Sequence, residues 1–179
     1  MRRSIVCMAG LLLAISCTNL TPQQRLAAYV NDPENKIVQS IQVGDVKAIA
    51  KLLPAEYRDP QPRSSQSSQS ISNEEYCYFN VRFEKNTVEK PTKEKLLYLN
   101  FDMQNDFTVF CAGDSISPVI CQKIETGMSG RYEYMVAFHN DDNRLSKNDF
   151  TLYYKDKIFG LGVIAFVYSQ KDIQQVPKI

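Results

Sequence analysis

Apolar and polar residues alternate through most of the chain after residue 75. A period of two predicts β-strands with one buried and one solvated face, a pattern typical of antiparallel sheet. In the first such run the apolar positions are Cys77, Phe79, Val81 and Phe83. Similar alternation predicts further strands over residues 97–101, 107–111, 132–138, 150–154 and 163–168.

Turn residues separate these runs. Gly113-Asp114 and Lys155-Asp156-Lys157 predict turns, and the chain returns between them from Ile116 to Ile124. Pro118 within that return indicates an edge strand, because proline cannot donate to a ladder. About nine short strands predict an all-β fold, an antiparallel β-sandwich of immunoglobulin-like architecture, with a barrel as the alternative. True immunoglobulin domains carry a Cys…Trp…Cys pattern that this chain lacks, so the label is one of topology.

A short N-terminal helix or spacer precedes this domain. Thr21 is a good N-cap and Pro22 a good first helical residue, while Asp32-Pro33 ends the pattern after about ten residues. The next segment, Ile37 to Leu53, has two interpretations. Gly44-Asp45 fits the two-residue turn of a β-hairpin. The alternative is a helix from Asp45 to Leu53, with Asp45 as its cap.

Residues 58–73 interrupt the pattern with two prolines and a Ser/Gln-rich stretch. Such a segment buries too little apolar surface to offset its ordering entropy, so we expect a mobile loop within one domain. The predicted organisation is a signal peptide over 1–16, a tether with a short helix over 17–35, and a single domain over 36–179.

The first residues carry an export pattern. Arg2 and Arg3 precede an apolar run that ends in small residues before Cys17. That run is too short to span about 30 Å of hydrocarbon. The stretch from Leu13 through Ser16 to Cys17 resembles the lipobox of bacterial lipoproteins, in which the cysteine is acylated and becomes the first residue. The resemblance implies lipidation of Cys17, and Thr18 after it points to the outer membrane.

Charge excludes one class of function. Removal of residues 1–16 leaves 163 of 179 residues and takes the formal net charge from +1 to −1, because Arg2 and Arg3 leave. A near-neutral chain offers no basic surface for nucleic acid. No cofactor motif is present either: Gly160-Leu161-Gly162 precedes a strand pattern, whereas a dinucleotide fingerprint opens a helix.

Three cysteines remain in the predicted mature domain, namely Cys77, Cys111 and Cys121. Export permits a disulfide, and Cys111–Cys121 is the predicted pair. The alternative is that all three are small buried core residues. Their spacing does not match a zinc site.

His139 is the chain's one histidine, and it precedes an acidic stretch. A general base positioned by Asp141 or Asp142 would need a nucleophile that the sequence does not place nearby. The Asp/Asn-rich loop lacks calcium-loop spacing, so we predict no metal site. Tyrosines on the sheet are expected mostly as half-buried pairs. If some share an exposed face, a glycan or peptide could bind, and the candidate residues are Tyr132, Tyr134, His139, Asp141 and Asp142.

Taken together, the sequence predicts a membrane-anchored, non-catalytic lipoprotein that serves as an accessory or assembly subunit of an envelope complex. Its predicted partners are the membrane, through the lipid, and other envelope proteins. The alternative is a ligand-binding module of the cell envelope for a glycan or peptide.

Overall fold

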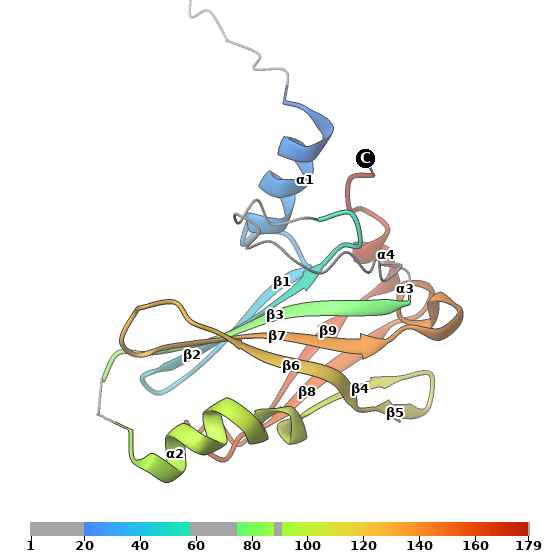
Figure 1. The fold of residues 1–179 in the computed structure, drawn as a ribbon. Helices are drawn as coiled ribbons and strands as arrows, with labels where there is room; N and C mark the ends of the chain where they lie inside the picture. Colours follow the sequence, from blue (N-terminus) through green and yellow to red (C-terminus); the bar gives the residue numbers. More distant parts are fainter. Residues whose placement is uncertain (1–19, 58–74, 88–90, 179) are drawn as a thin grey trace, which may run out of the picture.

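The computed structural model describes residues 20–57, 75–87 and 91–178 (Figure 1). The predicted signal peptide (1–16), the predicted lipidation site Cys17 and the predicted mobile loop (58–73) lie outside these residues. No helix in the described ranges is long and apolar enough to cross a membrane.

Two antiparallel sheets are the main regular structure of the described chain, so the predicted β class is confirmed. Sheet A has the order β1-β2-β3-β7-β6, and sheet B has the order β5-β4-β8-β9. The strands are β1 (Val38–Val43), β2 (Val46–Leu53), β3 (Tyr76–Lys85), β4 (Phe107–Cys111), β5 (Asp114–Ile116), β6 (Pro118–Ile124), β7 (Arg131–His139), β8 (Phe150–Lys155) and β9 (Val163–Tyr168). The finer immunoglobulin-like label stays a prediction.

Helical segments are short. The N-terminal helix has its predicted boundaries: Thr21 caps it, and the Thr21 hydroxyl and the Gln24 side chain form a capping box. The segments are α1 (Pro22–Asn31), α2 (Lys93–Leu97), the π-helical turn η1 (Tyr98–Asp102), the 3₁₀ turns η2 (Met103–Asp106) and η3 (Asp141–Asn143), α3 (Arg144–Lys147) and α4 (Gln170–Ile173).

The hairpin interpretation of residues 37–53 is confirmed. Val43 pairs with Val46 across a two-residue turn, and Gly44 has a φ of 59°, which glycine adopts without strain. Alternate residues of β2 are buried, namely Val46, Ala48, Ala50 and Leu52.

Two strand predictions are wrong in detail. Residues 97–101 form the end of α2 and η1, because Thr92 caps a run of good helix formers and its hydroxyl accepts from the N–H of Lys95. The run 116–124 is split: β5 pairs with β4 in sheet B, whereas β6 pairs with β7 at the edge of sheet A. Nine strands lie within the described residues, in agreement with the prediction, because the split offsets the lost strand.

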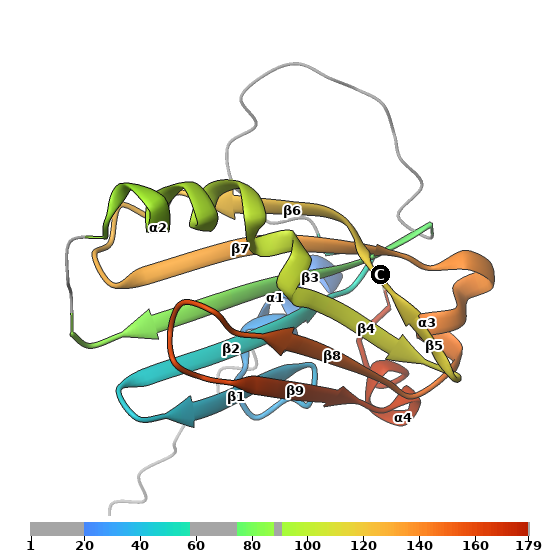
Figure 2. The ribbon, with the colours of Figure 1, turned by 90° about the horizontal axis from the view of Figure 1, so that it is seen from below.

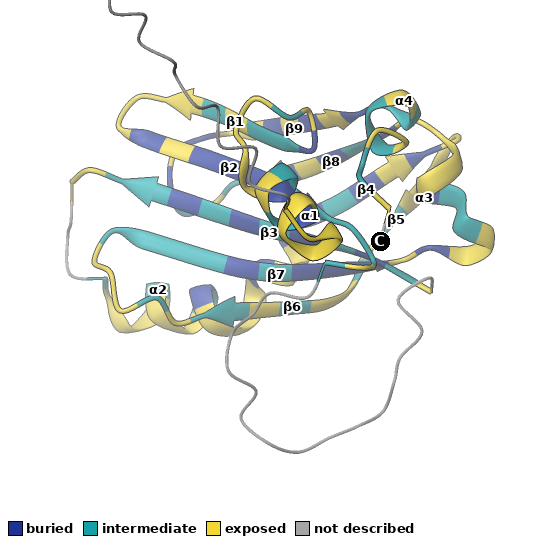
Figure 3. Cartoon of the chain, turned by 90° about the horizontal axis from the view of Figure 1, so that it is seen from above, coloured by how far each residue is buried: buried dark blue, intermediate teal, exposed yellow. Residues whose placement is uncertain are grey.

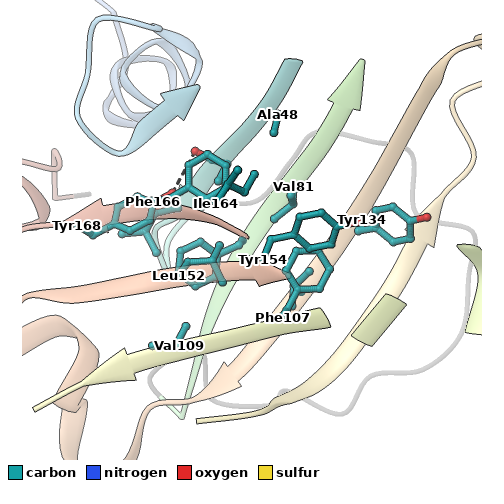
Figure 4. Close-up of a cluster of buried hydrophobic side chains, with 14 of the residues drawn as sticks. Ala48, Val81, Phe107, Val109, Tyr134, Leu152, Tyr154, Ile164, Phe166 and Tyr168 are labelled. Atoms are coloured by element: carbon teal, nitrogen blue, oxygen red, sulfur yellow. Dashed lines mark hydrogen bonds between the residues drawn. The ribbon is translucent and has the colours of Figure 1, made fainter. Parts of the chain in front are cut away.

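The inner faces of the two sheets share one hydrophobic core (Figure 4). Phe79 of sheet A lies 5.9 Å from Phe150 and 5.5 Å from Tyr168 of sheet B, measured between ring centroids. Buried tyrosines find hydrogen-bond acceptors there: the Tyr168 hydroxyl donates to the carbonyl of Ala50 at 3.1 Å. Aromatic pairs of this kind add to the stabilisation that burial itself provides.

The helix α1 and sheet B lie on opposite sides of sheet A (Figures 2 and 3). α1 contacts β2 and buries Leu26 and Val30. The segment from α2 to η2 lies beside sheet B and contacts β6. The outer face of sheet A, on which α1 packs, therefore forms one surface of the molecule. Sheet B and the α2–η1 segment form a second surface, which faces away from α1.

Candidate functional site

The predicted ligand-binding residues fall into two separate groups. Tyr132 and Tyr134 lie near the start of β7, while His139 ends the strand and Asp141 and Asp142 follow it. Seven residues of extended chain from Tyr132 to His139 span about 23 Å at 3.3 Å per residue. These residues do not form a single site.

Tyr134 lies in the core, where its hydroxyl donates to the carbonyl of Leu99 at 2.9 Å. Burial, together with nearby groups such as Cys121, raises the pKa of Tyr134 far above its ordinary value, so the ring stays neutral. Tyr132 packs on Phe159 with 5.2 Å between ring centroids. Tyr134 therefore packs inside the core, whereas Tyr132 is half-buried at the sheet surface.

His139 is exposed and packs on Tyr76, with ring centroids 5.0 Å apart. Tyr76 in turn lies 6.3 Å from Tyr78. The three rings form an aromatic cluster at one end of the outer face of sheet A. The outward phase of Tyr76 and Tyr78 was readable in the sequence, but their contact with His139 depends on the pairing of β3 with β7.

Asp141 and Asp142 belong to a turn and are exposed. The backbone carbonyl of Asp142 accepts a hydrogen bond from Lys147 Nζ at 2.8 Å. Within the described part of the chain, no group of three or more His, Cys, Asp or Glu residues could hold a metal ion.

The predicted Cys111–Cys121 disulfide is not formed; Cys77, Cys111 and Cys121 are free thiols. Cys111 ends β4 in sheet B, whereas Cys121 lies on β6 in sheet A, because the chain crosses between sheets after β5. Burial is the main cause that raises the pKa of Cys121 to about 12. The charge of Asp106, the residue before β4, raises it further. Cys77 and Cys111 therefore follow the alternative interpretation as buried core residues, whereas Cys121 is half-buried against the core.

A polar cluster, which the sequence alone did not indicate, stabilises the segment from α2 to η2. The side chain of Asp106 is fully buried; it accepts a hydrogen bond from the Tyr98 hydroxyl and lies 2.8 Å from Lys157 Nζ. Burial and the Asp106 hydrogen bond raise the pKa of Tyr98 to about 12, although Lys157 acts in the opposite direction. Since Lys157 follows β8, the cluster joins η2 to the β8–β9 loop.

The outer faces of the two sheets differ in chemistry. Sheet A carries ion pairs there: Glu84 lies 3.0 Å from Arg82 and 3.7 Å from Arg131. The outward residues of sheet B are mostly uncharged, and Lys155 at the margin carries the only charge among them. We call this set the sheet B outer face: Thr108, Phe110, Ser115, Thr151, Tyr153, Lys155, Val163, Ala165 and Val167.

Several large apolar side chains of this layer are open to solvent. Val163 is 66% exposed, Val167 is 62% exposed, and Phe110 and Tyr153 are also exposed. In the neighbouring α2–η1 segment, Leu96, Leu97 and Phe101 are exposed, Phe101 to 70%. Single exposed apolar residues are ordinary, whereas several that lie together on an uncharged surface are typical of interaction sites. Sheet B has such a surface, whereas α2 also carries Lys93, Glu94 and Lys95. The register of β4, β8 and β9 brings the exposed apolar residues of sheet B onto one face, which the sequence alone did not indicate.

Comparison with known proteins assigns no family. No family model matches the chain, and no curated protein matches it. Among solved structures, the chain is similar to a DUF4426 family protein from Pseudomonas aeruginosa, with 12% sequence identity and a TM-score of 0.44. The similarity covers 74% of this chain and 92% of that chain. It carries no statement about function.

Proposed function

We propose that this protein is a membrane-anchored, non-catalytic lipoprotein of the cell envelope that acts as an accessory or assembly subunit of an envelope complex. Its two sheets form a β-sandwich, and the sheet B outer face binds an uncharged, apolar surface of another envelope protein. The observation that carries the proposal is the exposed, nearly uncharged surface of sheet B on the side away from α1.

The length of the predicted tether supports an orientation in which α1 faces the membrane and sheet B faces the partner. Four residues separate Cys17 from Pro22, and the five Cα–Cα steps between the two span at most about 18 Å when extended. Acylation of Cys17 would therefore hold the start of α1 close to a lipid surface. Sheet B lies on the other side of sheet A from α1, so its outer face would point away from the bilayer, toward a partner.

The chemistry of the surface defines the partner. A charged partner surface would lose water against Phe110, Val163 and Val167 without gaining a counter-ion, which is unfavourable. A partner with an apolar, uncharged surface would instead gain from burial, at about 25 cal/mol per Å². The charged outer face of sheet A does not suit the same partner.

The test compares co-purification from detergent-solubilised membranes. The wild-type chain is expected to bring down envelope proteins in stoichiometric amounts, and Val163→Lys should lose them while keeping its fold. Val43→Lys, the same substitution at an exposed position of β1, is the matched control and should keep its partners. If the wild-type chain purifies alone, or if both variants lose the partners equally, the proposal that sheet B is a docking surface is contradicted. Mass spectrometry of Cys17 tests the anchor separately.

A second candidate function is glycan binding, favoured by the aromatic cluster of Tyr76, Tyr78 and His139. Aromatic rings stack on the apolar faces of sugars, and His139 is exposed at the end of this cluster. Binding to a glycan array that is lost in His139→Ala, together with a monomeric chain in membranes, would favour this function over the accessory role.

A further inference from the structure

A pocket of about 320 Å³ opens at the end of the molecule where β3 begins. Its walls come from the end of β2, the start of β3, the connection between β7 and β8, and the C-terminal segment. Figure 1 shows α3, α4 and the C-terminus gathered at this end. The pocket lies at the ends of the two sheets, so it is separate from the sheet B outer face.

The deep part of the pocket is apolar and uncharged. Leu52, Cys77, Leu145 and Phe150 line it, and each keeps between 1% and 8% of its surface exposed. Ile173 adds a partly buried aliphatic side chain from α4. A charged group placed here would lose its water without finding a counter-charge, which costs several kcal/mol or more.

The rim has a different chemistry. Asn143, Ser146 and Gln174 provide amide and hydroxyl groups that both donate and accept hydrogen bonds. Glu56 and Lys178 are the charged residues among the lining, and both are exposed at the mouth. The pocket thus combines an apolar interior with neutral polar groups at its entrance, as small-ligand sites commonly do.

One wall is held in place by a buried amide. Asn140 is 6% exposed; its Oδ1 accepts from the N–H of Leu145 at 2.8 Å, and its backbone N–H donates to the carbonyl of Glu75 at 2.9 Å. Asp142 and Asn143 adopt left-handed φ angles of 54° and 58°, which asparagine and aspartate tolerate better than most residues. This wall is therefore shaped before any ligand arrives, which lowers the entropic cost of binding.

We propose that this pocket binds a peptide segment by enclosing one aromatic or branched aliphatic side chain, while the polar rim bonds the peptide backbone. The volume lies at the lower end of the 300–1,000 Å³ range of ligand sites, so it suits one side chain with its peptide group. A saccharide would leave hydroxyl groups unpaired against Leu145 and Phe150, which is costly. The site extends the protein's role beyond docking through sheet B.

Cys77 provides a reporter inside the pocket, because it lines the wall while Cys111 and Cys121 do not. Membranes containing the full-length protein are treated with iodoacetamide long enough for the slowly reacting, buried Cys77 thiol of the wild-type chain to be alkylated, and alkylation of each cysteine is followed by peptide mass spectrometry. The probe is N-acetylphenylalaninamide, with N-acetyllysinamide and N-acetylglucosamine as charged and saccharide comparisons. At four times its Kd, the phenylalanine probe should slow Cys77 alkylation about five-fold, because a fifth of the sites remain empty.

Two neighbouring variants locate the effect. Gln174 lines the mouth of the pocket, whereas Gln175 is exposed and does not line it. Gln174→Trp should remove the protection of Cys77 by the probe, and Gln175→Trp should keep it. Absence of protection in the wild-type chain, or protection that persists in Gln174→Trp, would overturn the site. Equal protection by the lysine or sugar probe would overturn the assigned ligand class.

Discussion

At the scale of single residues, Asp156 organises the loop between β8 and β9. Its Oδ1 accepts from the N–H of Ile158 at 2.9 Å, and its Oδ2 accepts from the N–H of Leu161 at 2.6 Å. Burial raises the pKa of this carboxyl, but the backbone N–H groups of Ile158, Phe159 and Leu161 lower it by more, so the pKa lies below its ordinary value. The ionised form is therefore the one that the folded loop requires.

Asp156→Asn should lower the free energy of unfolding by about 1–3 kcal/mol at neutral pH, because an NH₂ group then faces backbone donors. A carboxyl whose pKa is lower in the folded state stabilises the fold above its unfolded pKa of about 3.9, and this contribution disappears as the pH falls through the folded pKa. Urea unfolding of the two proteins should therefore give a difference that shrinks as the pH falls below about 4.

Asp141→Asn is the control, since Asp141 is exposed in a turn, and it should change stability by less than about 0.5 kcal/mol. A difference between wild type and Asp156→Asn that stays constant with pH would show that the carboxylate charge has no part in holding the loop.

The thiols form a second residue-scale case. Burial raises the pKa of Cys77 far above its ordinary value, and that of Cys121 to about 12, so little thiolate exists near neutral pH. We expect all three described cysteines of the native protein to alkylate much more slowly than in denaturant, with half-buried Cys121 fastest. Residue-resolved mass spectrometry measures this, and native rates equal to those in denaturant would contradict the burial.

At the scale of elements, β9 is an edge strand with no charge in its six residues. Such edges invite pairing with other chains. Here the side chain of Gln39, from β1, bonds both backbone groups of Val167: its Oε1 accepts from the Val167 N–H at 3.1 Å, and its amide donates to the Val167 carbonyl. Gln39 thus occupies part of the edge as a neighbouring strand would.

Gln39→Ala should expose this edge, raise self-association and cost about 1 kcal/mol of stability, because the two hydrogen bonds to Val167 and the one to the Lys36 carbonyl are lost. Sedimentation velocity and thermal unfolding measure the two effects. Gln42→Ala is the matched control on the same strand, since its side chain bonds only within its own turn, to the carbonyl of Gly44. Equal self-association of the two variants would exclude a protective role for Gln39.

The elements also mark the limit of sequence-based prediction. Helix α1 and the β1–β2 hairpin follow local signals, such as Thr21-Pro22 and Gly44, and both were predicted. The strand expected over residues 97–101 was wrong because the surrounding sequence also fits a helical period. Leu96, Leu99 and Met103 are three and four positions apart, and Leu99 and Met103 are buried. The cap at Thr92 and the Tyr98–Asp106 contact favour the helical form.

At the scale of the whole molecule, alternation predicted which residues face inward but not which strands become neighbours. The aromatic cluster, the pocket and the sheet B outer face each depend on strand pairing or on the chain crossing between sheets. The cysteine pair failed for the same reason, since β5 and β6 belong to different sheets. Long-range contacts of this kind leave no local pattern, so the candidate sites could not be predicted from the sequence.

The core between the two sheets and the sheet B outer face should separate stability from partner binding. Phe79 is fully buried and contacts Phe138, Phe150 and Tyr168, whereas Phe110 is 43% exposed on the sheet B outer face. Phe79→Ala should therefore lower the free energy of unfolding by about 3–5 kcal/mol, because it leaves a cavity between the sheets. Phe110→Ala should cost less than about 1 kcal/mol and should instead weaken co-purification of the partner. Urea unfolding and pull-down of both variants measure the two effects. A large loss of stability in Phe110→Ala would mean that this ring serves the fold, and the outer face would then lose its case as a docking surface.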